Sequence, residues 1–282
     1  MPLNTLGHTQ LQLLRSHHVP ELLWQSLPPN WKRGESVLWY PDDPSHHHPS
    51  RTWIQSLWNY LRRHFTTKDD MSQLERLPLI PLSMSQTPVT LTRLSRPSWT
   101  VVKQYNEECI DEILANVVKR LGIIVLHDLP TFISYHPAVM GTYVHSPTVQ
   151  GAVKAMMTID STLLPGRFSE IFQKELSTTE KLALRSFLAN ISPFDIEKEG
   201  YRVFLCSLPI FETLSKRFVS KNDGLSAAPV DALPFPTPQD LIDISNDGSR
   251  ALAQLLKVRI LQPIEVLCEM IFPGIQIGRA HV

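Results

Sequence analysis

The sequence has little of several features that define common protein classes. Only 3 of its 282 residues are cysteine and only 11 are glycine. Cys109, Cys206 and Cys268 are widely spaced in apolar surroundings, which is typical of buried free thiols in a reducing compartment and not of a disulfide framework. No apolar run reaches the ~20 residues of a membrane-spanning helix, and residues 1–10 lack the pattern of a signal peptide. We therefore expect a cytoplasmic protein without membrane insertion.

An excess of charge of either sign is also missing. Lysine plus arginine and aspartate plus glutamate each number 27, which gives a formal net charge of zero. This balance excludes the broad basic footprint of a nucleic-acid-binding protein, so no nucleic-acid partner is expected. The apolar fraction of 43% and the charged fraction of 19% are typical of a globular chain, long enough for one large or two modest domains.

Motifs that carry chemistry are missing as well. The sequence has no phosphate-binding loop, no dinucleotide-binding loop and no nucleophile elbow. His145, Ser146 and Asp128 are the residue types of a catalytic triad, but no spacing places them together. His46-His47-His48 after Asp42-Asp43 is the only metal-like cluster, and adjacent histidines of an extended chain point to alternate sides. We expect no cofactor, no metal and no enzyme activity, with metal binding by these histidines as the less favoured alternative.

What the sequence does contain is a repeat. Leu77-Pro78-Leu79-Ile80 returns 131 positions later as Leu208-Pro209-Ile210-Phe211. Each block follows a stretch of helical spacing, residues 53–65 and residues 182–191. A period above about 50 residues is the size of a domain. The sequence thus predicts a mixed α+β fold with two similar α/β subdomains in tandem, preceded by an irregular segment rich in tryptophan and proline.

The predicted division of the chain follows from this repeat and from composition. It comprises an irregular segment over 1–49, a first subdomain over 50–126, a mostly helical connector over 127–177, a second subdomain over 178–276 and a non-native tail over 277–282, whose residues match a translated sequencing adapter. Alternation and apolar runs predict strands at 79–82, 89–91, 99–103, 123–126 and 217–220. Helical spacing predicts further helices at 148–159, 168–176, 249–258 and 263–272.

Several helix ends are marked by their capping residues. Ser50 is predicted to cap one helix, and Ser177 or Thr178 another, with Glu180 completing a capping box. A helix that begins at Asn106 is predicted to stop at Gly122. A second match between the copies, Ala115–Lys119 with Ala253–Lys257, has an offset of 138.

Particular blocks resemble the sacsin family. They run from Trp39-Tyr40-Pro41-Asp42-Asp43-Pro44 through residues 53–61 to Leu77-Pro78-Leu79-Ile80, and continue in the second copy at Leu208-Pro209-Ile210-Phe211 and Phe218-Val219. The similarity covers nearly all of residues 10–276. Members of this family are giant co-chaperones whose repeats begin with an ATPase module and continue through non-catalytic α/β segments. The resemblance is to such a segment downstream of an ATPase module.

The resemblance implies a part in protein folding and quality control in the cytoplasm. For the whole parent protein it implies heat-shock protein 70-type chaperones, the proteasome and intermediate filaments as partners. The family's functional motifs are not matched: His136-Pro137 precedes Ala138 where a J domain requires aspartate, so no site residue is carried over. We expect a scaffold or client-contact segment; a structural spacer is the alternative, and an unrecognised enzyme domain is the least favoured.

Five of the six tryptophans lie between positions 24 and 58. Prolines interrupt this stretch, so it is predicted to pack as irregular chain across a domain surface. The sharper hypothesis is an exposed aromatic surface that contacts client proteins through Trp24, Trp31, Trp39, Trp53 and Trp58. Burial of the rings separates the two, because exposed rings favour client contact and buried rings favour a structural segment.

Overall fold

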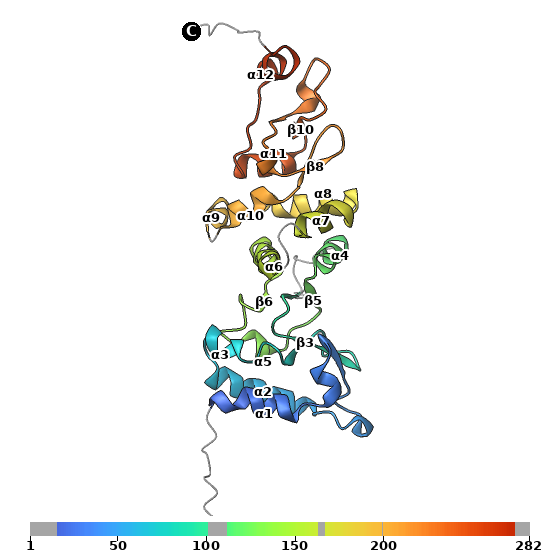
Figure 1. Ribbon diagram of the computed structural model, residues 1–282, viewed down its shortest axis with the longest axis vertical. Helices are drawn as coiled ribbons and strands as arrows, with labels where there is room; N and C mark the ends of the chain where they lie inside the picture. The colour runs from blue at the N-terminus through green and yellow to red at the C-terminus, as the bar shows by residue number, and fades with distance from the viewer. Residues whose placement is uncertain (1–15, 101–111, 163–166, 199, 274–282) are drawn as a thin grey trace, which may run out of the picture. The chain divides into compact units, whose positions relative to one another are not determined.

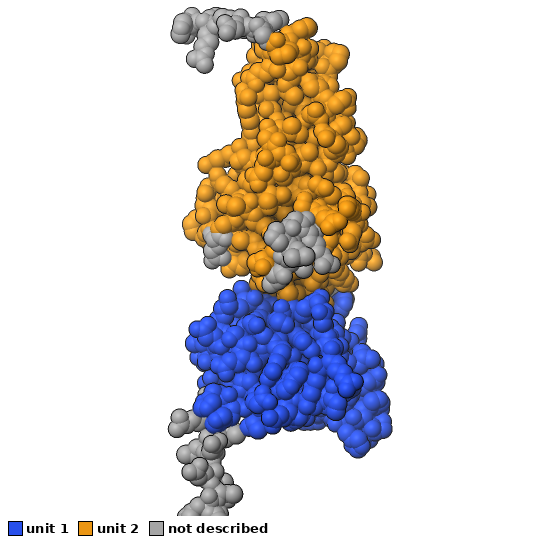
Figure 2. Space-filling model, in the orientation of Figure 1, with its two compact units in different colours: residues 1–96, 126–144 blue, residues 97–125, 145–282 orange. Residues whose placement is uncertain are grey.

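The computed structural model describes residues 16–100, 112–162, 167–198 and 200–273, and the chain forms two compact units. Unit 1 consists of residues 1–96 and 126–144, and unit 2 of residues 97–125 and 145–282 (Figure 2). The chain therefore leaves unit 1, returns to it and leaves it again.

Figure 1 labels many of the elements in chain order. Unit 1 contains η1 (Ser16–His18), α1 (Val19–Ser26), η2 (Pro29–Lys32), β1 (Ser36–Trp39), η3 (Pro44–His46), α2 (Arg51–His64), α3 (Lys68–Ser72), β2 (Pro78–Pro81), β3 (Val89–Arg93) and α5 (Thr131–Ser134). Unit 2 begins with β4 (Ser98–Thr100), α4 (Glu112–Arg120) and β5 (Ile124–Leu126), and β6 (Val144–His145) leads back into it.

The remainder of unit 2 alternates helices with very short strands. Its helices are α6 (Val149–Thr162), α7 (Arg167–Lys174), α8 (Thr178–Leu188), α9 (Pro193–Ile196), α10 (Tyr201–Ser207), η4 (Lys221–Asp223), η5 (Val230–Ala232), α11 (Asp247–Leu255), α12 (Pro263–Val266) and η6 (Leu267–Ile271). Its strands are β7 (Phe211–Glu212), β8 (Phe218–Val219), β9 (Ala227–Ala228) and β10 (Ile242–Asp243). The predicted α+β class is confirmed.

An antiparallel sheet of order β1-β3-β2 forms the centre of unit 1. In β1, Val37 and Trp39 are buried while Leu38 is 50% exposed, the alternation of a strand that covers a core with one face. The segment 1–49 was predicted as irregular and separate, and for its described part this is wrong. Residues 16–49 include the helix α1, and β1 pairs with β3 in full register, so this segment belongs to the same unit as α2.

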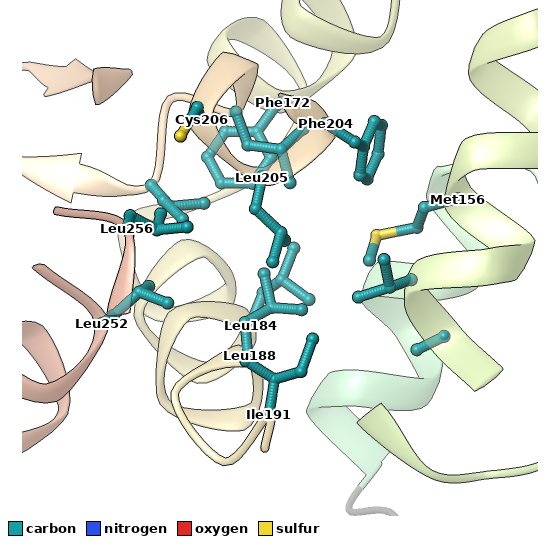
Figure 3. Packing of buried hydrophobic residues seen from close by; sticks show 14 of the residues in the cluster. Met156, Phe172, Leu184, Leu188, Ile191, Phe204, Leu205, Cys206, Leu252 and Leu256 are labelled. Atoms are coloured by element: carbon teal, nitrogen blue, oxygen red, sulfur yellow. The ribbon is translucent and has the colours of Figure 1, made fainter. Parts of the chain in front are cut away.

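The core of unit 2 is formed mainly by helices. Figure 3 shows Met156 of α6, Phe172 of α7, Leu184 and Leu188 of α8 and Phe204 of α10 packed together, all of them buried. Burial of each such side chain contributes about 1.5–3 kcal/mol relative to exposure. Cys206 is a buried free thiol and Cys268 a half-buried one; Cys109 lies outside the described residues.

One boundary between the units, at 125/126, lies next to the predicted boundary at 126, but the other two lie at 96/97 and 144/145 and none lies near 178. Trp99, Val117 and Val118 are fully buried in the same cluster as α6, α8 and α10, and this packing assigns residues 97–125 to unit 2. Residues 126–144, predicted to start a connector, pack with unit 1. The predicted tail 277–282 lies outside the described residues. Contact between residues far apart in sequence, which no local pattern encodes, sets these boundaries.

The repeat is visible in two helices, α2 and α8. Both are capped by serine: Ser50 Oγ accepts from the Trp53 amide and Ser177 Oγ from the Glu180 amide, and Glu180 completes the predicted capping box. Both helices then bury four residues at identical spacing, which are Ile54, Leu57, Trp58 and Leu61 in α2 and Lys181, Leu184, Arg185 and Leu188 in α8. The offset between these sets is 127.

Both copies also continue in the same order after these helices. Each Leu-Pro block follows a short helix and leads into an antiparallel hairpin, β2–β3 in one copy and β7–β8 in the other. The helix-then-strand order predicted around Pro78 and Pro209 is therefore present in both.

A helix that stops at a left-handed residue comes later in each copy. The Ile123 amide donates to the Val118 carbonyl past Gly122, and the Val258 amide donates to the Ala253 carbonyl past Lys257. This geometry matches Val118 with Ala253, an offset of 135 that corrects the predicted 138. The sheets around the helices differ: β5 pairs directly with β4, whereas β9 lies between β10 and a bridge at Ile260.

Candidate functional site

Three of the five tryptophans predicted to contact clients are not accessible. Trp31, Trp39 and Trp58 are 0% exposed. The Trp58 indole N–H donates to the Leu79 carbonyl oxygen over 3.1 Å, so even its polar atom is used inside unit 1. A fully buried ring has no surface for a partner, and for these three residues the predicted client contact is wrong in the folded chain.

The other two predicted residues, Trp24 and Trp53, are half-buried. The guanidinium of Arg76 lies 4.7 Å from the centre of the Trp24 ring, and the same group pairs with Glu21 over 2.9 Å. Part of the Trp24 face is thus covered by a cation. The sixth tryptophan, Trp99, is buried in unit 2. Four of the six tryptophans are therefore core, and the five predicted residues do not form one continuous aromatic surface.

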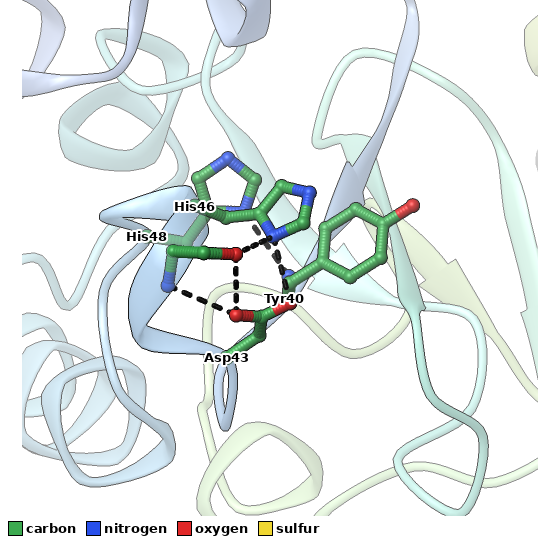
Figure 4. A network of polar contacts seen from close by, with 5 residues as sticks. Tyr40, Asp43, His46 and His48 are labelled. Carbon is green, nitrogen blue, oxygen red and sulfur yellow. Dashed lines mark hydrogen bonds and ion pairs between the residues drawn. The ribbon is translucent and has the colours of Figure 1, made fainter.

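The histidine cluster forms a capped turn next to Tyr40 (Figure 4). Asp43 Oδ1 accepts from the Ser45 amide over 2.9 Å and from its hydroxyl over 2.6 Å, and Asp43 Oδ2 lies 2.9 Å from His46 Nδ1. Hydrogen bonds from Ser45 hold the pKa of Asp43 below its usual value, with His46 adding to the effect. The turn is exposed, and its hydrogen bonds are local caps.

This turn has the residue types of a catalytic triad but not the geometry. Ser45 Oγ lies 3.2 Å from His46 Nδ1, the same nitrogen that faces Asp43. A base that relays a proton needs the hydroxyl on one ring nitrogen and the carboxylate on the other. Serine and aspartate compete for one nitrogen here, so this arrangement cannot perform that relay.

His48 is likewise used in packing. Its Nδ1 accepts from the Tyr40 amide over 3.1 Å and its ring meets Trp31 edge-on at 5.3 Å, and burial is the main cause that lowers its pKa. Across the described part of the chain, no three His, Cys, Asp or Glu side chains group as metal ligands. His46 is thus held by the hydrogen bonds of the turn, and His48 by the Tyr40 amide and the Trp31 ring.

The other candidate triad is not connected by hydrogen bonds. Asp128 accepts from the Ser83 hydroxyl over 2.7 Å and from the Met84 amide over 3.0 Å. His145 is buried in β6, and neither of its ring nitrogens has a hydrogen-bond partner among the described residues. Its burial, together with the charge of Lys154, lowers its pKa to about 4. Without an orienting carboxylate, His145 lacks the setting of a general base.

A pocket that the sequence did not indicate lies in unit 2. Its volume is about 610 Å³, and it is bounded by the end of α7, the start of α8, the β7–β8 hairpin and the turn that follows. The pocket is lined by Gln173, Thr178, Lys181, Lys216, Arg217, Phe218, Val219, Asp223 and Leu225. These residues span 53 positions of sequence and form no motif, which is why sequence patterns could not reveal the pocket.

Among the residues that the structure describes, no helix has both the length and the apolar character needed to cross a membrane.

Comparison with known proteins gives one clear relationship. No protein-family model matches the chain, and no solved structure matches it. Human sacsin is 31% identical to the chain over 272 residues. That match covers 92% of the chain but only 6% of sacsin, so the chain corresponds to a small part of the length of this relative. The chain is a sacsin-like segment.

Proposed function

We propose that this chain is a non-catalytic scaffold segment of a sacsin-like co-chaperone that acts in protein folding and quality control in the cytoplasm. The observation that carries the proposal is the burial of Trp31, Trp39, Trp58 and Trp99 at 0% exposure. A surface that holds unfolded clients needs accessible apolar area, whereas these rings stabilise the fold itself. The similarity to sacsin along nearly the whole chain supports the proposal that the parent protein is sacsin-like.

The proposal assigns chemistry and partner binding to other parts of that parent. Its ATPase modules, heat-shock protein 70-type chaperones, the proteasome and intermediate filaments would be engaged elsewhere. In this chain the His136-Pro137 pair cannot act as the exposed signature of a J domain, since His136 is fully buried and meets Trp58 edge-on at 5.7 Å. The contribution of this segment to the parent would be its two folded units.

Aggregation of a heat-denatured model client tests this role. The intact chain should fold cooperatively, leave the client's light scattering unchanged and fail to stimulate ATP hydrolysis by a seventy-kilodalton heat-shock chaperone. The matched variant is the double substitution Trp24→Ala with Trp53→Ala, which removes the half-buried rings and keeps the buried ones.

Client contact is the second candidate, because Trp24 and Trp53 keep some exposed surface. Suppression of aggregation by the intact chain, lost in the folded double variant, would overturn the scaffold proposal in favour of contact through these two rings. Suppression that survives the double variant would also contradict a pure scaffold and would place the contact outside the tryptophans.

A further inference from the structure

The pocket of unit 2 has an unusual balance of charge. Its lining includes three cations, Lys181, Lys216 and Arg217, and one carboxylate, Asp223. Asp223 is already occupied, because its Oδ2 accepts from the Ser220 amide over 2.6 Å and from the Ser220 hydroxyl over 3.0 Å. The lining residues alone carry two net positive charges, while Glu212 and Asp240 outside the lining pair with Lys216 and Arg217 and leave Lys181 without a carboxylate partner.

Lys181 is the buried cation of the pocket. It is only 8% exposed, although it carries an ammonium group. Its Nζ donates to the Gln173 carbonyl oxygen over 2.9 Å and lies 5.0 Å from the centre of the Phe218 ring. Within the described residues, no carboxylate comes within ion-pair distance of this nitrogen. Buried charges are ordinarily paired. A buried ammonium group without a counter-ion therefore strongly favours the binding of an anion.

Lys216 and Arg217 lie at the tip of the β7–β8 hairpin. Lys216 pairs with Glu212 over 3.3 Å and Arg217 pairs with Asp240, and both cations are well exposed. The Arg217–Asp240 pair is exposed on both sides and contributes little to stability, whereas Glu212 of the other pair is only 16% exposed. Lys216 has φ of +63°, a left-handed conformation that glycine adopts more easily, so the hairpin tip carries a cation at a position with a conformational cost.

Packing alone explains part of this arrangement. Lys181 caps the last turn of α7 and covers the Phe218 ring, which a purely structural lysine could also do. It does not explain why the pocket gathers two more cations around the buried one.

We infer that the pocket binds the phosphate group of a small phosphorylated ligand. Lys181 would hold the phosphate from below, Lys216 and Arg217 would close over it, and the hydroxyl of Thr178 would donate a further hydrogen bond. A phosphate dianion that displaces Glu212 and Asp240 from Lys216 and Arg217 would face three cations, and arginine matches phosphate geometry with two parallel donors. Phe218 and Leu225 offer an apolar wall to the rest of the ligand.

Isothermal titration with phenyl phosphate tests the inference, with inorganic phosphate and benzoate as comparison ligands. Phenyl phosphate should bind saturably, inorganic phosphate more weakly because it lacks the apolar part, and benzoate least. Lys181→Met keeps the apolar stem over Phe218 and should weaken binding at least tenfold. Lys198→Gln is the matched control, because Lys198 is in the same unit, pairs with Asp195 and does not line the pocket.

The double variant Lys216→Gln with Arg217→Gln provides a second test at exposed positions, where folding is not at risk. It should also weaken phenyl phosphate at least tenfold and reduce the preference over benzoate. Absence of saturable binding by the intact folded chain, or equal binding by the intact chain and the double variant, would overturn the inference. Neither result would affect the scaffold role, which depends on the tryptophans.

Discussion

The helices α2 and α8 occupy the same place in two copies of one pattern but bury different chemistry. Both bury four residues at the same spacing, and leucines fill two matching positions in each. Ile54 and Trp58 of α2 correspond to Lys181 and Arg185 of α8. The apolar pair belongs to the core of unit 1, whereas in unit 2 Lys181 lines the pocket and Arg185 is buried outside its lining. Matching positions of the repeated helix pattern are thus filled by apolar side chains in one copy and by buried cations in the other.

The two helices also differ in how their polar atoms are satisfied. The Trp58 indole N–H has an acceptor in the Leu79 carbonyl oxygen, while Arg185 Nε has no partner among the described residues. Burial lowers the pKa of Arg185, and the charges of Glu212 and Asp243 oppose that shift. At this position the polar atom of unit 1 has its hydrogen-bond partner. In unit 2 the buried Arg185 guanidinium keeps one nitrogen without a partner among the described residues.

The largest expected effect is at Trp58. Trp58→Ala should lower the free energy of unfolding of unit 1 by about 3–5 kcal/mol, because it opens a cavity and leaves the Leu79 carbonyl without its donor. Its counterpart Lys181→Met should change the stability of unit 2 by no more than about 1 kcal/mol, since it removes a desolvated charge and keeps the stem. Urea unfolding followed by tryptophan fluorescence reports mainly unit 1, and far-ultraviolet circular dichroism reports both units.

The control for this contrast is Trp53→Ala, which removes a half-buried ring from the same helix and should cost clearly less than Trp58→Ala. Equal losses from Trp58→Ala and Lys181→Met would show that the two positions are equally important to packing, and the comparison would fail.

The next effect is a dependence on pH that unit 2 should show through His145. Its folded pKa of about 4 lies below the ordinary value of 6.5. Above pH 6.5 both folded and unfolded states are neutral and nothing changes. As the pH falls from 6.5 to about 4 the unfolded state binds the proton first, so unit 2 loses about 3 kcal/mol. Chemical unfolding at several pH values measures this loss.

His145→Leu should remove most of that slope and leave stability near pH 7 unchanged or higher, because neither ring nitrogen has a partner to lose. His64→Asn, at an exposed position of α2, is the matched control and should keep the slope. A His145→Leu protein with an unchanged acid slope would contradict the assignment to this residue.

Substitutions at the two helix stops of unit 2 should change its stability in opposite directions. Gly122 has φ of +88° and Lys257 has φ of +56°. Gly122→Ala should destabilise unit 2 by about 1 kcal/mol, because a Cβ atom is unfavourable in this conformation although nothing closer than 3.8 Å obstructs it. Lys257→Gly should stabilise it by up to about 1 kcal/mol. Thermal unfolding measures both, and changes of the same sign would show that the stops are not equivalent.

The smallest effect concerns the serine caps. Ser50→Ala and Ser177→Ala should each cost about 1 kcal/mol, since each removes the acceptor for an amide in the first turn. Amide hydrogen exchange of the Trp53 and Glu180 amides measures the opening of each turn directly. Ser50→Thr and Ser177→Thr keep a hydroxyl and should restore most protection. A loss of exchange protection at only one of the two caps would show that the two copies already differ at their capping residues.

Much of the local structure could be predicted from sequence. The caps at Ser50 and Ser177, the stop at Gly122 and the strands around Pro78 and Val89 are as expected. These features depend on backbone torsions and hydrogen bonds within a few residues. The strand β1 escaped prediction because prolines surround it, and its partner residues in β3 lie 50 to 56 positions away. The stop at Lys257 escaped because lysine is not a residue that marks a left-handed position.

The sequence by itself determined the α+β class, the repeat, the helix ends and the similarity to sacsin. Each of these features depends on short-range patterns or on the order of the residues. Only the tertiary structure decided which tryptophans are core, how the chain divides into two units and where three cations meet in one pocket. Those outcomes depend on contacts between distant residues, and burial follows from such contacts rather than from the residue type alone.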